Sequence, residues 1–114
     1  MTALDRAKEV AQLIDSKKGD DVRVLHIGTL TSIGDYFVVA TGGSTTQVKA
    51  LADAVDERLS AQGLQPRRIE GYNTASWILM DYNDVIIHIF LKETREFYAL
   101  ERLWGDAPEV EWDN

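Results

Sequence analysis

The fold of this chain is decided by residues 71–91, GYNTASWILMDYNDVIIHIFL. Aliphatic and aromatic residues dominate two runs within it, 77–81 and 84–90, as is typical of β-strands. Tyr82 and Asn83 separate the two runs, and asparagine tolerates the positive φ that tight hairpin turns require. The stretch therefore predicts a β-hairpin with a two-residue turn.

This hairpin is expected to have two different faces, because successive side chains of a strand point to opposite sides of a sheet. In the predicted register Asp81 lies opposite Asp84, and all other pairs follow from that one. One face is purely apolar and is expected to be core; it carries Ile78, Met80, Val85, Ile87 and Ile89. The other face mixes aromatic, acidic and imidazole groups; it carries Trp77, Leu79, Asp81, Asp84, Ile86, His88 and Phe90. The mixed face is the first place to look for function.

Length and composition limit the class of protein. The chain has 114 residues, enough for one domain with a modest core. No apolar run is long enough to span a membrane, and the N-terminal MTALDRAKEV lacks the apolar segment of a signal peptide, so we expect no membrane association. The absence of cysteine excludes disulfides, thiol catalysis and cysteine-ligated metal sites.

The charge balance is acidic. Twelve basic residues against nineteen acidic ones give a net charge of −7. Binding to nucleic-acid phosphates requires a basic stripe, whereas this sequence has only short pairs, at 17–18 and 67–68, so we expect no direct DNA binding. The charge favours a basic protein partner, although it is equally compatible with a role in solubility alone.

The remaining residues predict helices and strands around the hairpin. A first amphipathic helix ends near Gly19, and a second opens at a capping box formed by Ser44 and Gln47 and stops at Gly63. A last helix is expected after Lys92, with Thr94 as its N-cap. Its apolar face comprises Phe97, Leu100 and Trp104. Strands are predicted at 22–27, 36–40 and 67–70.

These elements predict a single α/β domain over residues 1–105, with a mixed sheet of about five strands packed by three helices. The order strand, helix, strand across residues 36–70 predicts a β-α-β unit with parallel strands. The pattern does not determine the order of the strands. Residues 106–114 are expected to form a solvated, mobile acidic C-terminal tail.

Catalytic and metal-binding patterns are weak. The turn at Gly42, Gly43 and Ser44 precedes a helix, but it matches neither a P-loop nor a dinucleotide fingerprint. Nucleotidyltransferases combine such a turn with paired carboxylates on the next strand, where this chain offers only Glu70. Asp81 and Asp84 flank the predicted hairpin turn and could approach each other, but they are weak candidates for metal ligands because the sequence offers no basic cluster to bind a triphosphate. We therefore expect no catalytic site and no cofactor.

The histidines give no further sign of chemistry. His26 and His88 are far apart in the sequence, and neither has a partner at metal-ligand spacing, so we expect no metal site. Aromatic and acidic groups on one sheet face are instead typical of a protein–protein interface. The hypothesis is a partner-binding face. Its residues are Tyr72, Trp77, Leu79, Asp81, Asp84 and His88.

Three groups of residues resemble the signatures of a known family. The first group comprises residues 35–42, Ser44 and 47–50. The second comprises 70–72, 77–82, 84–85 and 88–90. The third comprises 95–98, 100–101 and 103–104. They resemble the ribosomal silencing factor family, also called the Iojap or RsfS family, from the first helix to Trp104. Asn83 stands where that family usually has glycine, a conservative change for a turn. The acidic tail is not part of the shared pattern.

The resemblance implies a nucleotidyltransferase-like fold without the catalytic carboxylates. It implies a protein that is not an enzyme and binds the large ribosomal subunit through ribosomal protein L-fourteen. Such a protein blocks subunit joining and represses translation when nutrients are limiting, as in stationary phase. It also implies homodimers, and the lack of a transit segment favours a cytoplasmic bacterial member. Two alternatives stay open: a small nucleotidyltransferase-like enzyme and a self-associating structural dimer.

Overall fold

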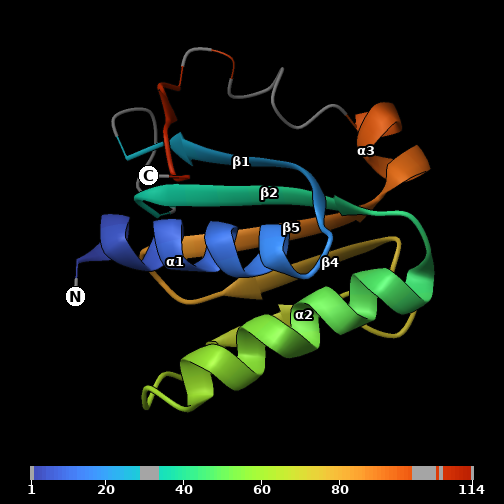
Figure 1. Cartoon of the computed structure of the whole chain (residues 1–114), viewed down its shortest axis with the longest axis horizontal. Helices are drawn as coiled ribbons and strands as arrows, with labels where there is room; N and C mark the ends of the chain where they lie inside the picture. Colours follow the sequence, from blue (N-terminus) through green and yellow to red (C-terminus); the bar gives the residue numbers. More distant parts are fainter. Residues whose placement is uncertain (1, 29–33, 99–104, 106, 114) are drawn as a thin grey trace.

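The computed structural model describes residues 2–28, 34–98, 105 and 107–113. They form an α/β fold around one mixed sheet of six strands, in the order β3-β4-β5-β2-β1-β6 (Figure 1). The helices are α1 (Ala3–Ser16), α2 (Thr45–Ser60) and α3 (Lys92–Tyr98). The strands are β1 (Asp20–His26), β2 (Tyr36–Gly42), β3 (Arg68–Glu70), β4 (Trp77–Asp81), β5 (Val85–Leu91) and β6 (Glu109–Val110). The predicted fold class is confirmed, with six strands in place of about five.

The sheet is built around β5, which lies between β4 and β2. It pairs antiparallel with β4 and parallel with β2. Six of its seven residues are buried, as expected for a strand covered on both faces. Strands β2 and β3 run in the same direction, as the β-α-β prediction requires, but β5 and β4 lie between them.

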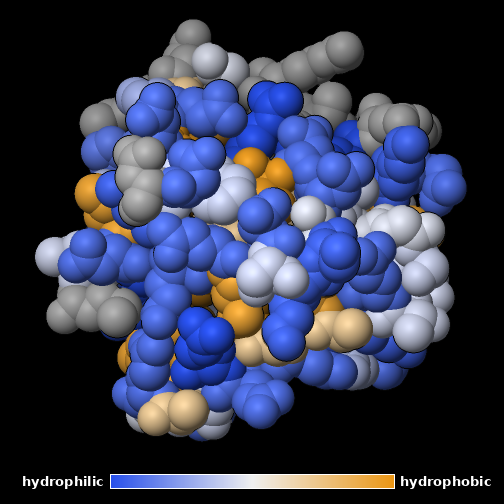
Figure 2. Space-filling model, viewed as in Figure 1, coloured by the Kyte–Doolittle hydropathy of each residue, from blue (hydrophilic) through white to orange (hydrophobic). Residues whose placement is uncertain are grey.

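Helices α1 and α2 cover one face of the sheet, and α3 lies on the other (Figure 1). The larger hydrophobic cluster fills the space under α1 and α2 and includes Ile14, Leu51, Ile78 and Ile87. A smaller cluster on the opposite face includes Phe37, Ile86 and Phe90. On the side shown in Figure 2, hydrophobic residues form only small areas among hydrophilic ones.

Helix α3 begins earlier than the sequence suggested. It starts at Lys92, directly after β5, so Thr94 lies inside the helix and its assignment as the N-cap is wrong. The predicted apolar positions Leu100 and Trp104 lie outside the described residues.

The hairpin turn also differs from its predicted position. The amide of Tyr82 donates to the Val85 carbonyl over 3.0 Å, so Asn83 and Asp84 form the turn. Asn83 has a φ of 75° there. As a result Asp81 pairs with Ile86 instead of Asp84. The shift is an even number of residues, so each side chain within the paired strands keeps its predicted face.

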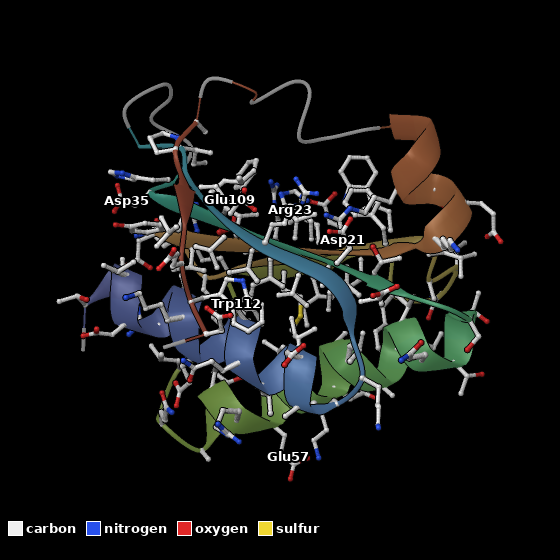
Figure 3. The ribbon with its side chains drawn as sticks, turned by 45° about the horizontal axis from the view of Figure 1, so that its top comes forward. Asp21, Arg23, Asp35, Glu57, Glu109 and Trp112 are labelled. Carbon is white, nitrogen blue, oxygen red and sulfur yellow. The ribbon has the colours of Figure 1, made fainter. Side chains whose placement is uncertain are left out.

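The C-terminal segment is not the solvated tail that was expected. Glu109 and Val110 form β6, which pairs antiparallel with β1. The indole of Trp112 donates to the Val22 carbonyl over 3.2 Å, and the Gln12 amide donates to the Trp112 carbonyl over 2.6 Å. Trp112 thereby attaches the segment to both β1 and α1 (Figure 3).

We expect Trp112→Ala to loosen this attachment. The His26 amide donates to the Pro108 carbonyl over 2.8 Å, so its hydrogen exchange reports directly on the C-terminal segment. The variant should lose about 1–2 kcal/mol of stability and exchange the His26 amide several-fold faster. Exposed Glu111 provides a control, because Glu111→Gln should leave both quantities unchanged. Unchanged His26 exchange in Trp112→Ala would contradict the prediction.

Candidate functional site

The mixed face of the hairpin is more buried than the sequence suggested. The apolar set is core, as predicted: its five residues are all 0% exposed. On the mixed face, however, His88 is only 4% and Asp81 only 8% exposed. Trp77 and Leu79 are half-buried and pack at the border of the smaller cluster. Of the mixed-face residues within β4 and β5, only Trp77 and Leu79 are not buried.

Trp77 and His88 form a hydrogen-bonded pair below that surface. The indole Nε1–H donates to His88 Nδ1 over 3.1 Å, so the neutral imidazole carries its proton on Nε2. Burial lowers the pKa of His88 from 6.5 to about 4, so the ring is neutral at neutral pH. Within the described part of the chain, Nε2 has no hydrogen-bond partner. His88 thus orients Trp77 and leaves one buried donor unsatisfied.

The two acidic residues beside the turn have partners within the chain. Asp81 accepts a hydrogen bond from the Asn83 amide over 2.8 Å, and its other oxygen lies 3.6 Å from Arg68 Nε. Asp84 lies in the turn, with Oδ1 3.5 Å from Arg6 Nη1 of α1. These contacts hold the turn and partly neutralise both carboxylates, so neither is a free negative group awaiting a basic partner.

Tyr72 belongs to a different surface. Its ring packs against the larger cluster, on the side of α1 and α2, whereas Trp77 and Leu79 pack against the smaller one. The Tyr72 hydroxyl donates to the Asp53 carboxylate, with oxygen distances of 2.9 and 3.2 Å. This hydrogen bond raises the pKa of Tyr72. The predicted set of six residues is therefore divided between the two sides of the sheet.

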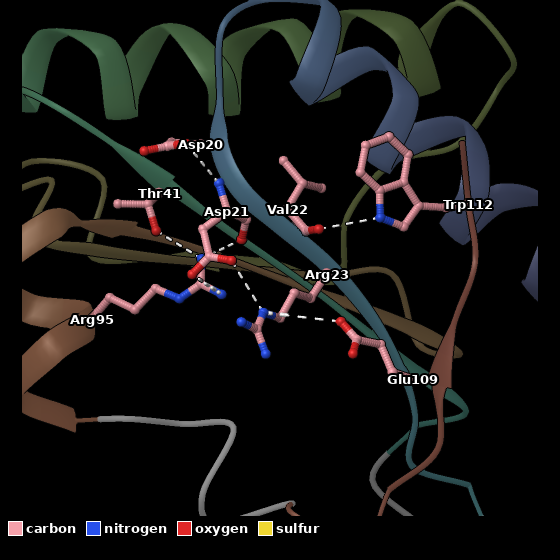
Figure 4. A network of polar contacts seen from close by, with 8 residues as sticks. All are labelled: Asp20, Asp21, Val22, Arg23, Thr41, Arg95, Glu109 and Trp112. Carbon is pink, nitrogen blue, oxygen red and sulfur yellow. Dashed lines mark hydrogen bonds and ion pairs between the residues drawn. The ribbon is translucent and has the colours of Figure 1, made fainter. Parts of the chain in front are cut away.

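A polar network that the sequence did not reveal joins α3 to the strands (Figure 4). Buried Arg95 donates to the Asp21 carbonyl and the Thr41 hydroxyl, and its Nη2 lies 3.2 Å from the Asp21 carboxylate. Arg23 Nε then links Asp21, at 3.1 Å, to Glu109 of β6, at 3.9 Å. Asp21 has a φ of 45° where the β1–β2 register shifts. The network ties the start of β1 to β2, α3 and β6.

The glycine turn before α2 has its own hydrogen bonds. The Gln47 amide donates to Ser44 Oγ over 3.1 Å, and Gln47 Oε1 accepts from the Gly43 amide over 2.6 Å. The predicted cap is therefore present, and the Gly43 amide that a phosphate would need is already used.

Neither a metal cluster nor a membrane helix is found in the described ranges. The residues there include no group of three or more His, Asp or Glu side chains placed to hold a metal ion. None of the described helices is long and apolar enough to cross a membrane.

Comparison with known proteins identifies relatives along the whole chain. The family model described as "Ribosomal silencing factor during starvation" matches residues 1–114. The Bacillus subtilis protein named "Ribosomal silencing factor RsfS" is 37% identical over 106 residues, which cover 93% of this chain and 90% of that protein. The protein of the same name from Halalkalibacterium halodurans is 42% identical over 98 residues, covering 86% and 84%. A crystal structure from Chromobacterium violaceum matches with a TM-score of 0.89 and 33% identity, covering 100% and 94%.

Proposed function

The chain belongs to the ribosomal silencing factor family, and we propose that it silences ribosomes by binding the large ribosomal subunit. The observation that carries this proposal is the match of the whole chain, residues 1–114, to the family model. The contact on the subunit is ribosomal protein L-fourteen. Bound there, the chain blocks joining of the small subunit and represses translation under nutrient limitation.

The proposed contact surface, here called the docking face, is the accessible part of the mixed hairpin face. It consists of Trp77 and Leu79 on β4 with Arg68 and Glu70 beside them on β3. Glu70 pairs with Leu79 in the β3–β4 register, so their side chains share one face. Half-buried aromatic and aliphatic groups bordered by charged ones are typical of residues that contribute most to protein binding.

The other predicted residues have supporting roles in this proposal. His88 holds the indole of Trp77 through its Nδ1, and Asp81 holds Arg68 and the turn. Asp84 lies at the rim, beside Arg6. Tyr72, on the other side of the sheet, is not assigned to the docking face.

Steric blocking needs affinity and a rigid surface, but no chemistry. Strand β4 supplies rigidity because it is hydrogen-bonded to β3 on one side and β5 on the other. The net charge of −7 disfavours contact with ribosomal RNA phosphates and favours a basic ribosomal protein. We therefore propose that the chain is not an enzyme and acts in the cytoplasm, where the subunits are.

A matched pair of lysine substitutions tests the docking face. Leu79→Lys places a charge in its centre, and we expect about tenfold weaker binding to isolated large subunits. Ile69→Lys makes a similar change on the neighbouring strand, but Ile69 pairs with Met80 and therefore lies on the opposite side. It should bind like the unmodified chain.

Co-sedimentation with large subunits measures the affinity, and light scattering on mixing the two subunits measures their joining. Thermal unfolding confirms that both variants are folded. If folded Leu79→Lys binds and blocks joining like the unmodified chain, the docking face is wrongly placed. If the unmodified chain itself fails to bind large subunits, the proposed function is wrong.

The proposal includes self-association into a homodimer, as the resemblance implies. Sedimentation velocity over graded concentrations, with Leu79→Lys in parallel, tests whether the dimer uses the docking face. A dimer that persists in Leu79→Lys would place self-association elsewhere on the molecule.

A further inference from the structure

A groove lies between α2 and the edge strand β3, on the opposite side of the sheet from the docking face. Its volume is about 310 Å³. It is lined by Ala52, Asp53, Asp56, Ile69, Tyr72 and Met80. Met80 belongs to the cluster under α1 and α2, which places the groove on their side. The proposed function assigns no role to this surface.

The groove has an apolar floor that reaches the surface. Ile69 is 38% exposed and is the one exposed large hydrophobic side chain among the described residues. A single exposed isoleucine is ordinary, but this one continues into the groove beside Ala52 and Met80. A partner's apolar side chain could therefore be covered on several sides at once.

The neighbouring backbone is available for pairing. Strand β3 is at one end of the sheet order, and all three of its residues are exposed. The Arg67 amide donates inward to the Asp81 carbonyl over 2.6 Å. The Tyr82 amide and the Ser76 carbonyl bond to β5, so Leu79 and Asp81 direct their backbone groups to β3, where they pair with Glu70 and Arg68. The N–H and C=O of Ile69, between these two, then face outward. An extended peptide can add to such an edge as another strand.

The charged groups at the rim define which peptide fits. Asp53 is exposed and Asp56 half-exposed, and both are on α2. Among the described residues, neither carboxylate forms a salt bridge, in contrast to Asp81 and Asp84. The Tyr72 hydroxyl donates to Asp53 and holds that carboxylate at the groove. The Lys49 ammonium also lies near, 5.6 Å from the centroid of the Tyr72 ring, so the rim carries two carboxylates and one ammonium. The remaining negative charge favours lysine or arginine and repels phosphates.

We propose that this groove is a second docking site, which binds an extended basic polypeptide segment as an additional strand on β3. An apolar side chain of the segment covers Ile69 and Met80, and a basic side chain reaches Asp53 and Asp56. The groove and the docking face share strand β3 but lie on opposite sides of the sheet. The site therefore goes beyond the proposed contact with the large subunit.

The probe for this site is a synthetic capped peptide of alternating lysine and valine. Titrated into the ¹⁵N-labelled chain, it should cause saturable shifts in amides of β3, Tyr72 and residues 52–56. A peptide with glutamate for lysine should not bind. A third peptide, N-methylated on alternate residues, cannot donate to the edge and should bind far more weakly. Shifts centred on β4 and β5, or equal binding of the methylated peptide, would overturn the proposal.

Neighbouring acidic residues of α2 provide a charge-matched pair of variants. Asp56→Asn removes a charge at the groove and should weaken binding of the lysine peptide about threefold. Glu57→Gln removes the same charge from the next residue, which is exposed, lies outside the groove lining and points away from the sheet (Figure 3). It should have little effect. Equal weakening by both variants would mean that the peptide senses only net charge, and would overturn the proposal.

The lysine pair used for the docking face separates the two surfaces. Ile69→Lys should abolish saturable peptide binding while keeping affinity for large subunits. Leu79→Lys should keep saturable peptide binding and lose affinity for large subunits. Loss of peptide binding in folded Leu79→Lys, with Ile69→Lys unaffected, would show that the peptide uses the docking face and that no second site exists.

Discussion

Replacing Gly71 by alanine is expected to destabilise the protein by about 3 kcal/mol, a large fraction of the stability of a small domain. Gly71 has a φ of 77°, a conformation that side chains other than glycine rarely adopt. A Cβ at this position would also collide with the carbonyl oxygen of Trp77. That oxygen belongs to the backbone at the start of β4, so it cannot move without moving the strand.

Gly63 provides a matched control for this prediction. Its φ of 83° is similar, but a Cβ there would meet nothing within 4 Å. Gly63→Ala should therefore cost only the backbone strain, about 1 kcal/mol. Chemical denaturation of both variants measures the difference. Equal losses would show that backbone strain alone matters at Gly71 and that the close approach to Trp77 has no energetic consequence.

The second large effect is a loss of stability in acid caused by His88. Burial among the rings of Phe37, Trp77 and Phe90 lowers its pKa from 6.5 to about 4. Between these values the unfolded chain binds the proton and the folded chain does not, so stability rises with pH. The contribution is complete above pH 6.5 and is lost as the pH falls towards 4. It amounts to about 3 kcal/mol.

A variant without a titrating group at position 88 separates the contribution of His88 from the contribution of the carboxylates to the pH dependence of stability. His88→Asn retains an acceptor near the position of Nδ1, where the Trp77 indole donates. Its free energy of unfolding should change much less between pH 7 and pH 4.5 than that of the unmodified chain. His26→Asn is the control, because it removes the other imidazole from the surface stack with Tyr36. It should keep the full dependence, and identical pH dependence in all three proteins would contradict the prediction.

The division of the hairpin into two faces was predictable because strand alternation has a period of two. The turn itself was misplaced, since both pairs, Tyr82 with Asn83 and Asn83 with Asp84, contain the asparagine that accepts a positive φ. Tertiary contacts decide between them. Tyr82 is 7% exposed in the cluster beneath α1 and α2, and Asp81 binds the Asn83 amide. Burying the tyrosine therefore moves the two-residue turn by one position towards the C-terminus.

The C-terminal strand was missed although a signal was present. Residues 109–112 read Glu-Val-Glu-Trp, which alternates polar and apolar residues as a strand does. The acidic composition of the segment suggested solvation instead. Two residues of strand have little intrinsic stability, so pairing with β1 and the attachment of Trp112 to Val22 are what hold the segment in place.

The predicted partner-binding face rested on residue type and on position in the hairpin. The structure shows that its members differ in burial. Asp81 and His88 are beneath the surface, where Arg68 and Trp77 respectively contact them. Tyr72 is only five positions before Trp77 in the sequence, yet it faces α2. The contacts that divide them come from residues far away in the chain, such as Asp53, which no local pattern identifies.

The hairpin, its two faces, the cap of α2 and the family could all be predicted from the sequence, because they depend on neighbouring residues or on motifs in a fixed order. The order of the strands, the pairing of the C-terminal segment with β1 and the exposure of each candidate residue become clear only in the folded chain. Those features arise from contacts between segments distant in sequence, and their energies depend on which surfaces meet. The stretch 71–91 therefore specifies a hairpin with two faces, and contacts with the rest of the chain determine how deeply each side chain of the mixed face is buried.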